Sequence, residues 1–272
     1  MMFRISRRAT YILALASVAT PAFAGGDLLV APTRVVLDGP RGTEVFLNNV
    51  GTTTAVYRIS LELKRMNAAG ELEEIKPDAA NPKEQSTLSM ISYAPRRVEL
   101  APNQPQAIRI GVRAPVDLPD GEYRAHMLFR AIPTATPPVA AGESAKGVSI
   151  ALTPIYGVTI PIIVRKGALK ATAAISDARM VTTEDGPSFA FTLTRAGDRS
   201  TYGRVRVTKA GVAQPLIDAR GIAVYAELGS RTVSFPVPPA VAAQLTGPIR
   251  IEYLEDANVG GGTIAALQTV VR

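Results

Sequence analysis

Apolar and polar residues alternate along most of this chain with a period of two, which is the spacing of a strand that buries one face. The alternating segments are residues 57–64, 107–112, 189–193, 205–207 and 249–253, and residues 123–130 alternate less cleanly. Turn dipeptides such as Asp120-Gly121 and Asp185-Gly186 separate these segments. Helical spacing is scarce, and only residues 239–245 indicate a turn or two of helix. The pattern predicts an all-β chain.

The first 24 residues have the features of an export signal. Arg4, Arg7 and Arg8 precede a short apolar stretch, and Ala22-Phe23-Ala24 matches the small-x-small pattern of a cleavage site. The apolar stretch is too short to cross a bilayer, so we expect cleavage near Gly25 and a soluble exported product. Removing the signal lowers the net charge by three, from +7 to +4. The expected location is a bacterial periplasm.

Composition excludes several kinds of functional site. The chain has no cysteine and a single histidine, which excludes disulfides, thiolate metal sites, cysteine nucleophiles and zinc sites built on histidine pairs. It also has no tryptophan and only 6% aromatic residues, which disfavours stacking on bases or sugars. We therefore expect no catalytic residues, no cofactor, no metal, no nucleic-acid partner and no membrane insertion. The histidine, His126, is expected at the surface or half-buried on a strand.

The spacing of turns and strands indicates two domains. Hydrophobic residues make up 47% of the chain, enough for packed cores. A new series of short strands begins after Arg165-Lys166-Gly167, so we divide the chain into a signal peptide (1–24), a first β-sandwich (25–165) and a second (166–272). Residues 66–90 are polar and predict a long excursion between two strands. Residues 133–147 are rich in Pro, Ala and Gly and predict a loop.

The longest alternating run covers residues 148–164. Its in-register positions are Val148, Ile150, Leu152, Pro154, Tyr156, Val158, Ile160, Ile162 and Val164. Such a run is about three times as long as an average strand, and its two prolines favour the edge of a sheet. Two interpretations are open. The run is a long strand buried in its own sandwich or passing between the domains, or it is an edge strand that offers apolar side chains to a partner lacking a strand.

Several segments occur in a recognisable order and spacing. They are Ala31-Pro32-Thr33-Arg34-Val35-Val36, Asn48-Asn49-Val50-Gly51, residues 93–110 with their proline turn and strand arginine, residues 118–133, the run from Val148 and, more loosely, Arg199-Ser200-Thr201-Tyr202-Gly203. Together they resemble the periplasmic pilus-assembly chaperones of the chaperone–usher pathway. The resemblance covers nearly all of the chain after the signal and is strongest in the first domain.

The resemblance implies two immunoglobulin-like β-sandwich domains in a boomerang arrangement. It also implies that the protein is not an enzyme. Such a chaperone binds unfinished pilus or fimbrial subunits, lends them a donor strand and delivers them to an outer-membrane usher. The donor residues expected here are Val148, Ile150, Leu152, Pro154, Tyr156, Val158 and Ile160.

In this family an arginine of the first strand and a lysine of the donor strand anchor the C-terminal carboxylate of the subunit. Arg34 matches the arginine, but Gly157 or Thr159 stands near the place of the lysine. Either other groups hold the carboxylate or the grip is looser. Arg109 is the expected substitute and Arg96 or Arg97 are weaker ones, because a guanidinium offers two parallel donors to a carboxylate. The departure resembles the divergent, archaic branch of the family. The alternatives are a surface or interdomain salt bridge for Arg34 and a solvated strand face for Arg109.

Two other classes of function are open. The chain could be an exported structural or adhesive β-sandwich protein of a surface fibre, and binding to free, unfinished subunits separates that reading from a chaperone. An exported enzyme or carbohydrate-binding module is disfavoured by the single histidine and the absence of cysteine and tryptophan.

Overall fold

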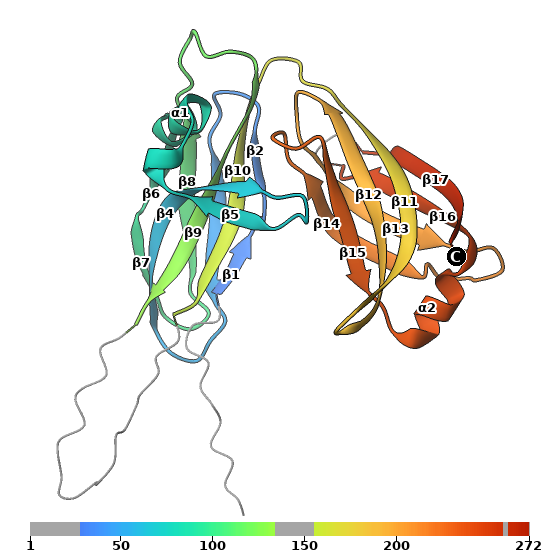
Figure 1. Cartoon of the computed structure of the whole chain (residues 1–272). Coiled ribbons are helices and arrows are strands. Elements are labelled where there is room, and N and C mark those ends of the chain that lie inside the picture. Colours follow the sequence, from blue (N-terminus) through green and yellow to red (C-terminus); the bar gives the residue numbers. More distant parts are fainter. Residues whose placement is uncertain (1–27, 134–154, 258–260, 272) are drawn as a thin grey trace, which may run out of the picture.

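The computed structural model describes residues 28–133, 155–257 and 261–271 and contains two β-sandwiches set at an angle to each other (Figure 1). The all-β prediction and the boomerang arrangement are confirmed. The expected signal peptide and most of the expected loop lie outside the described residues. In the described part of the chain, no helix combines the length and the apolar character that crossing a bilayer requires.

The first sandwich consists of two sheets. One is antiparallel throughout, and the other is antiparallel except for one parallel pair of strands. The strands of this sandwich are β1 (Leu28–Ala31), β2 (Val35–Leu37), β3 (Thr43–Asn49), β4 (Ala55–Met66), β5 (Leu72–Ile75), β6 (Ile91–Ala94), β7 (Arg97–Leu100), β8 (Pro105–Val112), β9 (Gly121–Ile132) and β10 (Gly157–Lys166). One sheet has the order β1-β3-β8-β6. The other has the order β2-β10-β9-β4-β5, and β7 also pairs with β4.

The alternation of β9 shows why this sequence forms a sandwich. Tyr123, Ala125, Met127 and Phe129 point inward, and none of them is more than 4% exposed. They pack against inward residues of the neighbouring strands in one hydrophobic core. Burying such side chains contributes about 1.5–3 kcal/mol each, so the period-two pattern fixes which face of the strand is buried.

The second sandwich is built in the same way. Its elements are β11 (Ala171–Thr183), β12 (Gly186–Gly197), β13 (Thr201–Thr208), β14 (Ile217–Val224), β15 (Ser230–Pro236), α2 (Pro239–Leu245), β16 (Gly247–Glu255) and β17 (Thr263–Val271). One sheet has the order β11-β12-β15, and the other has the order β14-β13-β16-β17. Phe189, Phe191 and Tyr253 are fully buried in its core. The short helix expected at residues 239–245 is present.

Residues 66–90 are more structured than the sequence suggests. They contain β5, a short 3₁₀ helix (Pro77–Ala79) and the α-helix α1 (Pro82–Met90). The helix begins with a capping box: the Asn81 side chain accepts from the Glu84 backbone N–H at 2.9 Å, and the Glu84 carboxylate accepts from the Asn81 N–H at 2.8 Å. The helix buries only Thr87 and Met90, so it lacks the apolar stripe that would have revealed it.

The hairpin of β4 and β5 reaches across to the second sandwich (Figure 1). Met66 and Ile163 of the first sandwich pack against Ala223 and Tyr225 of the second, and we call this small core the domain junction. The backbone N–H of Thr232 donates to the carbonyl of Ala68 at 2.8 Å. These contacts hold the two sandwiches at a defined angle.

Candidate functional site: an open strand edge and the domain junction

Strand β10 is covered on one side for only part of its length. Along its whole length it pairs antiparallel with β9. On its other side, β2 pairs with it in parallel, but only at residues 162–164. In the part of the chain that the structure describes, residues 157–161 therefore pair with no strand on this side, and we call them the open edge.

The directions in which the backbone groups of the open edge point can be inferred from one hydrogen bond at its start. The N–H of Ala131, in β9, donates to the carbonyl of Tyr156 at 2.9 Å. Because backbone groups alternate between the two sides of a strand, Gly157 and Thr159 direct their N–H and C=O groups outward, away from β9. Pro161 directs its carbonyl outward and has no N–H to leave unpaired. The open edge thus offers two donors and three acceptors to an incoming strand.

The expected donor side chains are distributed unevenly. Tyr156 is 49% exposed, whereas Val158 is half-buried against the core and Ile160 is 2% exposed within it. For Ile160 the structure agrees with the first interpretation of the run, a strand buried in its own sandwich. The donor role of these side chains stays a prediction. Val148, Ile150, Leu152 and Pro154 lie outside the described residues.

The opposite face of β10 looks toward the second sandwich. Ile163 on this face is fully buried in the domain junction. Gly157, Thr159 and Pro161 lie on the same face, since they are separated from Ile163 by even numbers of residues. The two positions expected near the place of the family's lysine share this face but are exposed rather than buried in the junction, and they carry no charge.

Arg34 lies where the open edge, β2 and the second sandwich meet. It immediately precedes β2, and its guanidinium lies over the ring of Tyr202, 4.4 Å from the centroid. Its Nη2 donates to the hydroxyl of Ser200 at 3.2 Å. The two contacts reach across from the first sandwich to the second, as an arginine of a domain interface would.

The remaining nitrogens of Arg34 are not satisfied by the described residues. Its Nε and Nη1 atoms are buried and have no hydrogen-bond partner there. Burial lowers the pKa of Arg34 from its ordinary value, although the carboxylate of Glu122 opposes this effect. A cavity of about 490 Å³ adjoins the residue and is lined by Pro32, Thr33, Arg34, Val35, Val36, Thr43, Tyr202 and Asp256. A buried guanidinium with free donors is costly and calls for a hydrogen-bond acceptor.

A buried carboxylate links the two sandwiches beside Arg34. Glu122, in β9, is 4% exposed and accepts from Nε of Arg165 at 3.0 Å. It also accepts from the backbone N–H of Ser200 at 3.1 Å. Glu122, Arg165 and Ser200 all lie in segments that the sequence singles out, but no local pattern indicates that these three residues meet.

Arg109 does not join this group. It lies in β8, in the other sheet of the first sandwich, where its side chain is 84% exposed and its Nε is 3.2 Å from the carboxylate of Glu44. It is not among the residues that line the cavity at Arg34. The structure corresponds to the alternative reading of Arg109 as part of a solvated face, and it does not bring the expected substitute for the lysine to Arg34.

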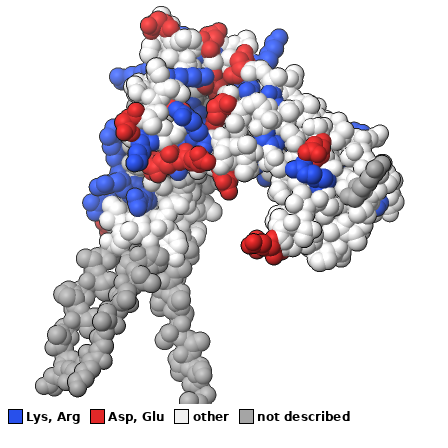
Figure 2. Space-filling model, in the orientation of Figure 1, with Lys and Arg blue, Asp and Glu red and all other residues white. Residues whose placement is uncertain are grey.

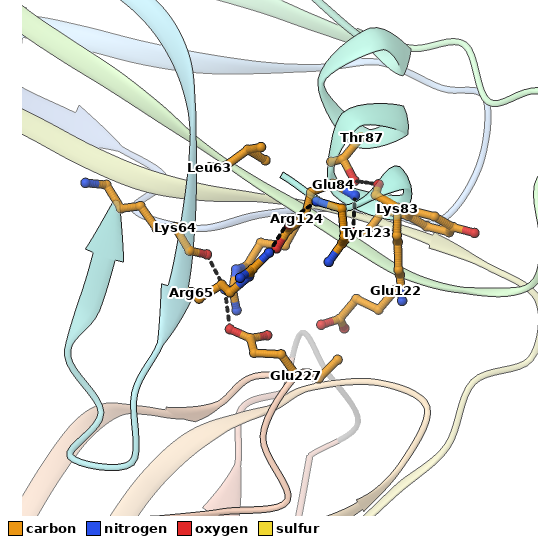
Figure 3. A pocket seen from close by; sticks show the side chains of 12 residues that line it. Leu63, Lys64, Arg65, Lys83, Glu84, Thr87, Glu122, Tyr123, Arg124 and Glu227 are labelled. Carbon is orange, nitrogen blue, oxygen red and sulfur yellow. Dashed lines mark hydrogen bonds and ion pairs between the residues drawn. The ribbon is translucent and has the colours of Figure 1, made fainter. Parts of the chain in front are cut away.

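Arg124 of β9, rather than Arg109, is the second arginine at the domain junction (Figure 3). Its guanidinium is 3.5 Å from the ring centroid of Tyr225, and its Nη2 donates to the carbonyl of Lys64 at 2.7 Å and to Glu227 at 2.6 Å. It lines a small pocket of about 170 Å³ between β4, α1 and the second sandwich. A contact between strand β9 and the loop at Glu227 could not be found from local sequence, because the two are about a hundred residues apart.

His126 corrects a sequence expectation. It is 1% exposed rather than at the surface, and its ring meets that of Tyr225 edge-on with centroids 6.3 Å apart. Burial and the nearby cations Arg124, Lys64 and Arg34 lower the pKa of His126 to about 3. The residue is neutral at ordinary pH and acts as part of the junction. Among the described residues, no group of His, Asp or Glu side chains could hold a metal ion.

Comparisons with solved structures find chains of low sequence identity that are similar over most of their length. A chain of the CsuC–CsuE chaperone–tip adhesion subunit complex, from archaic Csu pili of Acinetobacter baumannii, is 14% identical, with 90% of this chain and 99% of that chain covered and a TM-score of 0.48. The E. coli chaperone DraB is 15% identical, with 91% and 97% covered and a TM-score of 0.45. The Pseudomonas aeruginosa chaperone CupB2 is 14% identical, with 90% and 100% covered and a TM-score of 0.45. No protein-family profile and no curated protein sequence matches the chain.

Proposed function

We propose that this chain is a periplasmic chaperone that binds unfinished pilus or fimbrial subunits by strand pairing and delivers them to an outer-membrane usher. Its function is binding, without covalent chemistry. Residues 1–24 are removed on export, residues 25–165 form the subunit-binding domain, and residues 166–272 form the second. The single observation that carries the proposal is the open edge of β10.

An open strand edge is a template for pairing with another chain. The outward groups of Gly157, Thr159 and Pro161 can form main-chain hydrogen bonds with an added strand. A pilus subunit that lacks one strand of its own sheet has the complementary defect. Pairing would satisfy both edges, and the alternating side chains upstream of Tyr156 would cover the exposed core of the subunit.

The position of β2 supports a particular direction for the added strand. Because β2 pairs with β10 on the same side as the open edge, a strand added there would lie in line with β2. Its end would then meet the chain at Arg34, just before Val35. If the added strand runs parallel to β10, as β2 does, the end that meets Arg34 is its carboxyl terminus.

Arg34 is suited to hold that terminus. Two of its buried nitrogens lack partners among the described residues, and the adjoining cavity has room for a carboxylate. Charge-assisted hydrogen bonds between guanidinium and carboxylate are about twice as strong as neutral ones. The missing lysine is then no obstacle, since Arg34 alone can offer more than one donor.

The test is copurification from a periplasm. The chain would be coexpressed with the fibre subunits encoded beside its gene, as wild type, as Thr159→Pro and as Thr159→Val. Proline at this position removes an outward N–H without taking a hydrogen bond from β9, whereas valine keeps the N–H and serves as the control. Melting curves of the free variants would first establish that they fold.

We expect wild type and Thr159→Val to retain subunits and Thr159→Pro to lose most of them. If folded Thr159→Pro holds a subunit as well as wild type, the open edge is not the binding site. If wild type retains no subunit at all, an exported structural or adhesive protein of a surface fibre becomes the better reading.

A further inference from the structure

Three arginines stand side by side on neighbouring strands of the first sandwich. Arg97 of β7 is the direct partner of Arg58 in β4, and Arg58 is the direct partner of Arg130 in β9. Residues directly opposite each other in a sheet share a face. We call Arg97, Arg58 and Arg130 the arginine row. It ends at Gly157, the partner of Arg130 in β10 and the first residue of the open edge.

The arginine row faces solvent. All three residues are exposed, while their sequence neighbours Val98, Tyr57 and Phe129 are buried in the core. Alternation therefore directs the arginines away from the core. Figure 2 shows Lys and Arg side chains gathered on this part of the first sandwich, over the region where β4, β7 and β9 lie.

The arginine row has a carboxylate nearby but forms no ion pair with it: Glu99 lies two residues from Arg97 on the same exposed face of β7. None of its three members forms an ion pair within the described ranges, in contrast to Arg204 and Arg250 of the second sandwich, which pair with Asp218 and Glu252. Like charges directly opposite each other destabilise a sheet. The adjoining segment 134–154 contains one acidic and one basic residue, and so it brings no excess negative charge.

The row is placed to meet a strand added at the open edge. Neighbouring strands lie about 4.8 Å apart, so a residue of an added strand opposite Gly157 would be two spacings, about 10 Å, from the Cα atom of Arg130. Gly157 contributes no side chain to the space between them. An extended arginine and a carboxylate side chain can together bridge that distance.

We propose that the arginine row binds acidic side chains of the subunit segment that the open edge receives. The open edge thereby prefers segments in which an Asp or Glu lies opposite Gly157, on the face of the sheet that carries the arginine row. The inference rests on the proposed function for the identity of the partner, and it adds the chemistry by which one segment is preferred over another.

The test uses short fluorescent peptides that alternate valine with aspartate, lysine or serine. Their binding to the full exported chain would be measured by fluorescence anisotropy at low and high ionic strength. The test variant is Arg58→Gln/Arg97→Gln/Arg130→Gln. The matched control, Arg109→Gln/Arg179→Gln/Arg250→Gln, removes the same charge from exposed arginines outside the row. A second variant, Arg58→Lys/Arg97→Lys/Arg130→Lys, keeps the charge and tests whether charge restores affinity for the aspartate peptide.

We expect wild type and the control triple to bind the aspartate peptide at least tenfold more tightly than the lysine peptide. The glutamine variant should lose about tenfold in affinity for the aspartate peptide, and the loss should shrink at high salt. Equal binding of the three peptides by wild type, or equal losses in both triple variants, would overturn the proposal.

Copurification separates this proposal from the proposed function. If the glutamine variant loses no affinity for the aspartate peptide while wild type still copurifies with subunits, the arginine row fails and the chaperone function stands. If wild type prefers the aspartate peptide but copurifies with no subunit, the chemistry of the row is supported and the chaperone function is contradicted. If vesicles of anionic lipid bind to the row and the aspartate peptide does not, the proposal is also overturned.

Discussion

Glu122 of the first sandwich accepts a hydrogen bond from the backbone N–H of Ser200 in the second, at 3.1 Å and with both residues buried. The same oxygen accepts from Nε of Arg165 at 3.0 Å. One carboxylate thus satisfies a donor from each sandwich. Arg34 also donates to the hydroxyl of Ser200, so two residues of the first sandwich bind this one residue of the second.

Replacing Glu122 with alanine should destabilise the protein by about 3–5 kcal/mol, because Arg165 would keep its buried charge and lose its partner. Chemical unfolding measures this change. Glu44→Ala is the matched control, since Glu44 pairs with Arg109 at the surface. It should cost less than about 1 kcal/mol. Equal losses of stability in the two variants would show that the buried pair stabilises the protein no more than the exposed pair does.

Replacing Arg34 with glutamine should weaken subunit binding by about tenfold or more, which corresponds to losing one charge-assisted hydrogen bond. Titration calorimetry with an isolated subunit measures the affinity. The control is the same subunit with an amidated C-terminus, for which wild type and Arg34→Gln should bind alike. A loss that is equal for both forms of the subunit would contradict a role in holding the carboxylate.

Ile160 and Tyr156 should respond differently to truncation, although both belong to the same alternating run. Ile160→Ala should cost about 2–5 kcal/mol of stability, because the side chain is in the core. Tyr156→Ala should change stability by less than about 0.5 kcal/mol, because the side chain is half exposed. Thermal and chemical unfolding of the free protein distinguish the two. Equal costs would mean that the run is buried throughout.

His126 should make stability depend on pH below neutrality. Its pKa falls from 6.5 to about 3 on folding, so the unfolded chain binds the proton more readily. Stability is then fully present above about pH 6.5 and is lost as pH falls, by about 1.4 kcal/mol per unit down to about pH 3. Arg124, Lys64 and Arg34 add to the effect, and Glu62 lies directly opposite on β4.

The variant His126→Phe tests this dependence. The unfolding free energy of wild type minus that of the variant should rise as the pH is raised from 5 to about 6.5 and should level off above that pH. The contributions of carboxylates common to both proteins cancel in this difference. Phenylalanine suits the site, because neither ring nitrogen of His126 has a hydrogen-bond partner among the described residues. If this free-energy difference stays constant with pH, protonation of His126 is not what destabilises the protein at low pH.

The fold was predictable because its information is local. Alternation in segments such as 123–130 identified the buried face of each strand, and helical spacing in residues 239–245 indicated a short helix. Helix α1 was missed because its signal is a cap at Asn81 rather than an apolar stripe. His126 was misplaced because strand alternation does not reveal that a second domain covers the outer face of a sheet.

The candidate site was predictable only in part. Arg34 was recognised from its place in a motif, and the structure puts it at the junction. Arg109 has the same residue type and a strand position, but it lies in the other sheet. Arg124 and Tyr225 come from segments about a hundred residues apart, so their stacking depends on how the domains pack. Sequence reasoning identifies residue types, and tertiary structure decides which of them meet.

The partial cover that β2 gives to β10 also limits self-association. Within the described residues, two copies that met edge to edge could exchange bonds over residues 157–161, where Pro161 lacks a donor. After residue 161, β2 already occupies this side of β10, so a contact between two copies cannot extend in that direction, as it can along longer exposed edges.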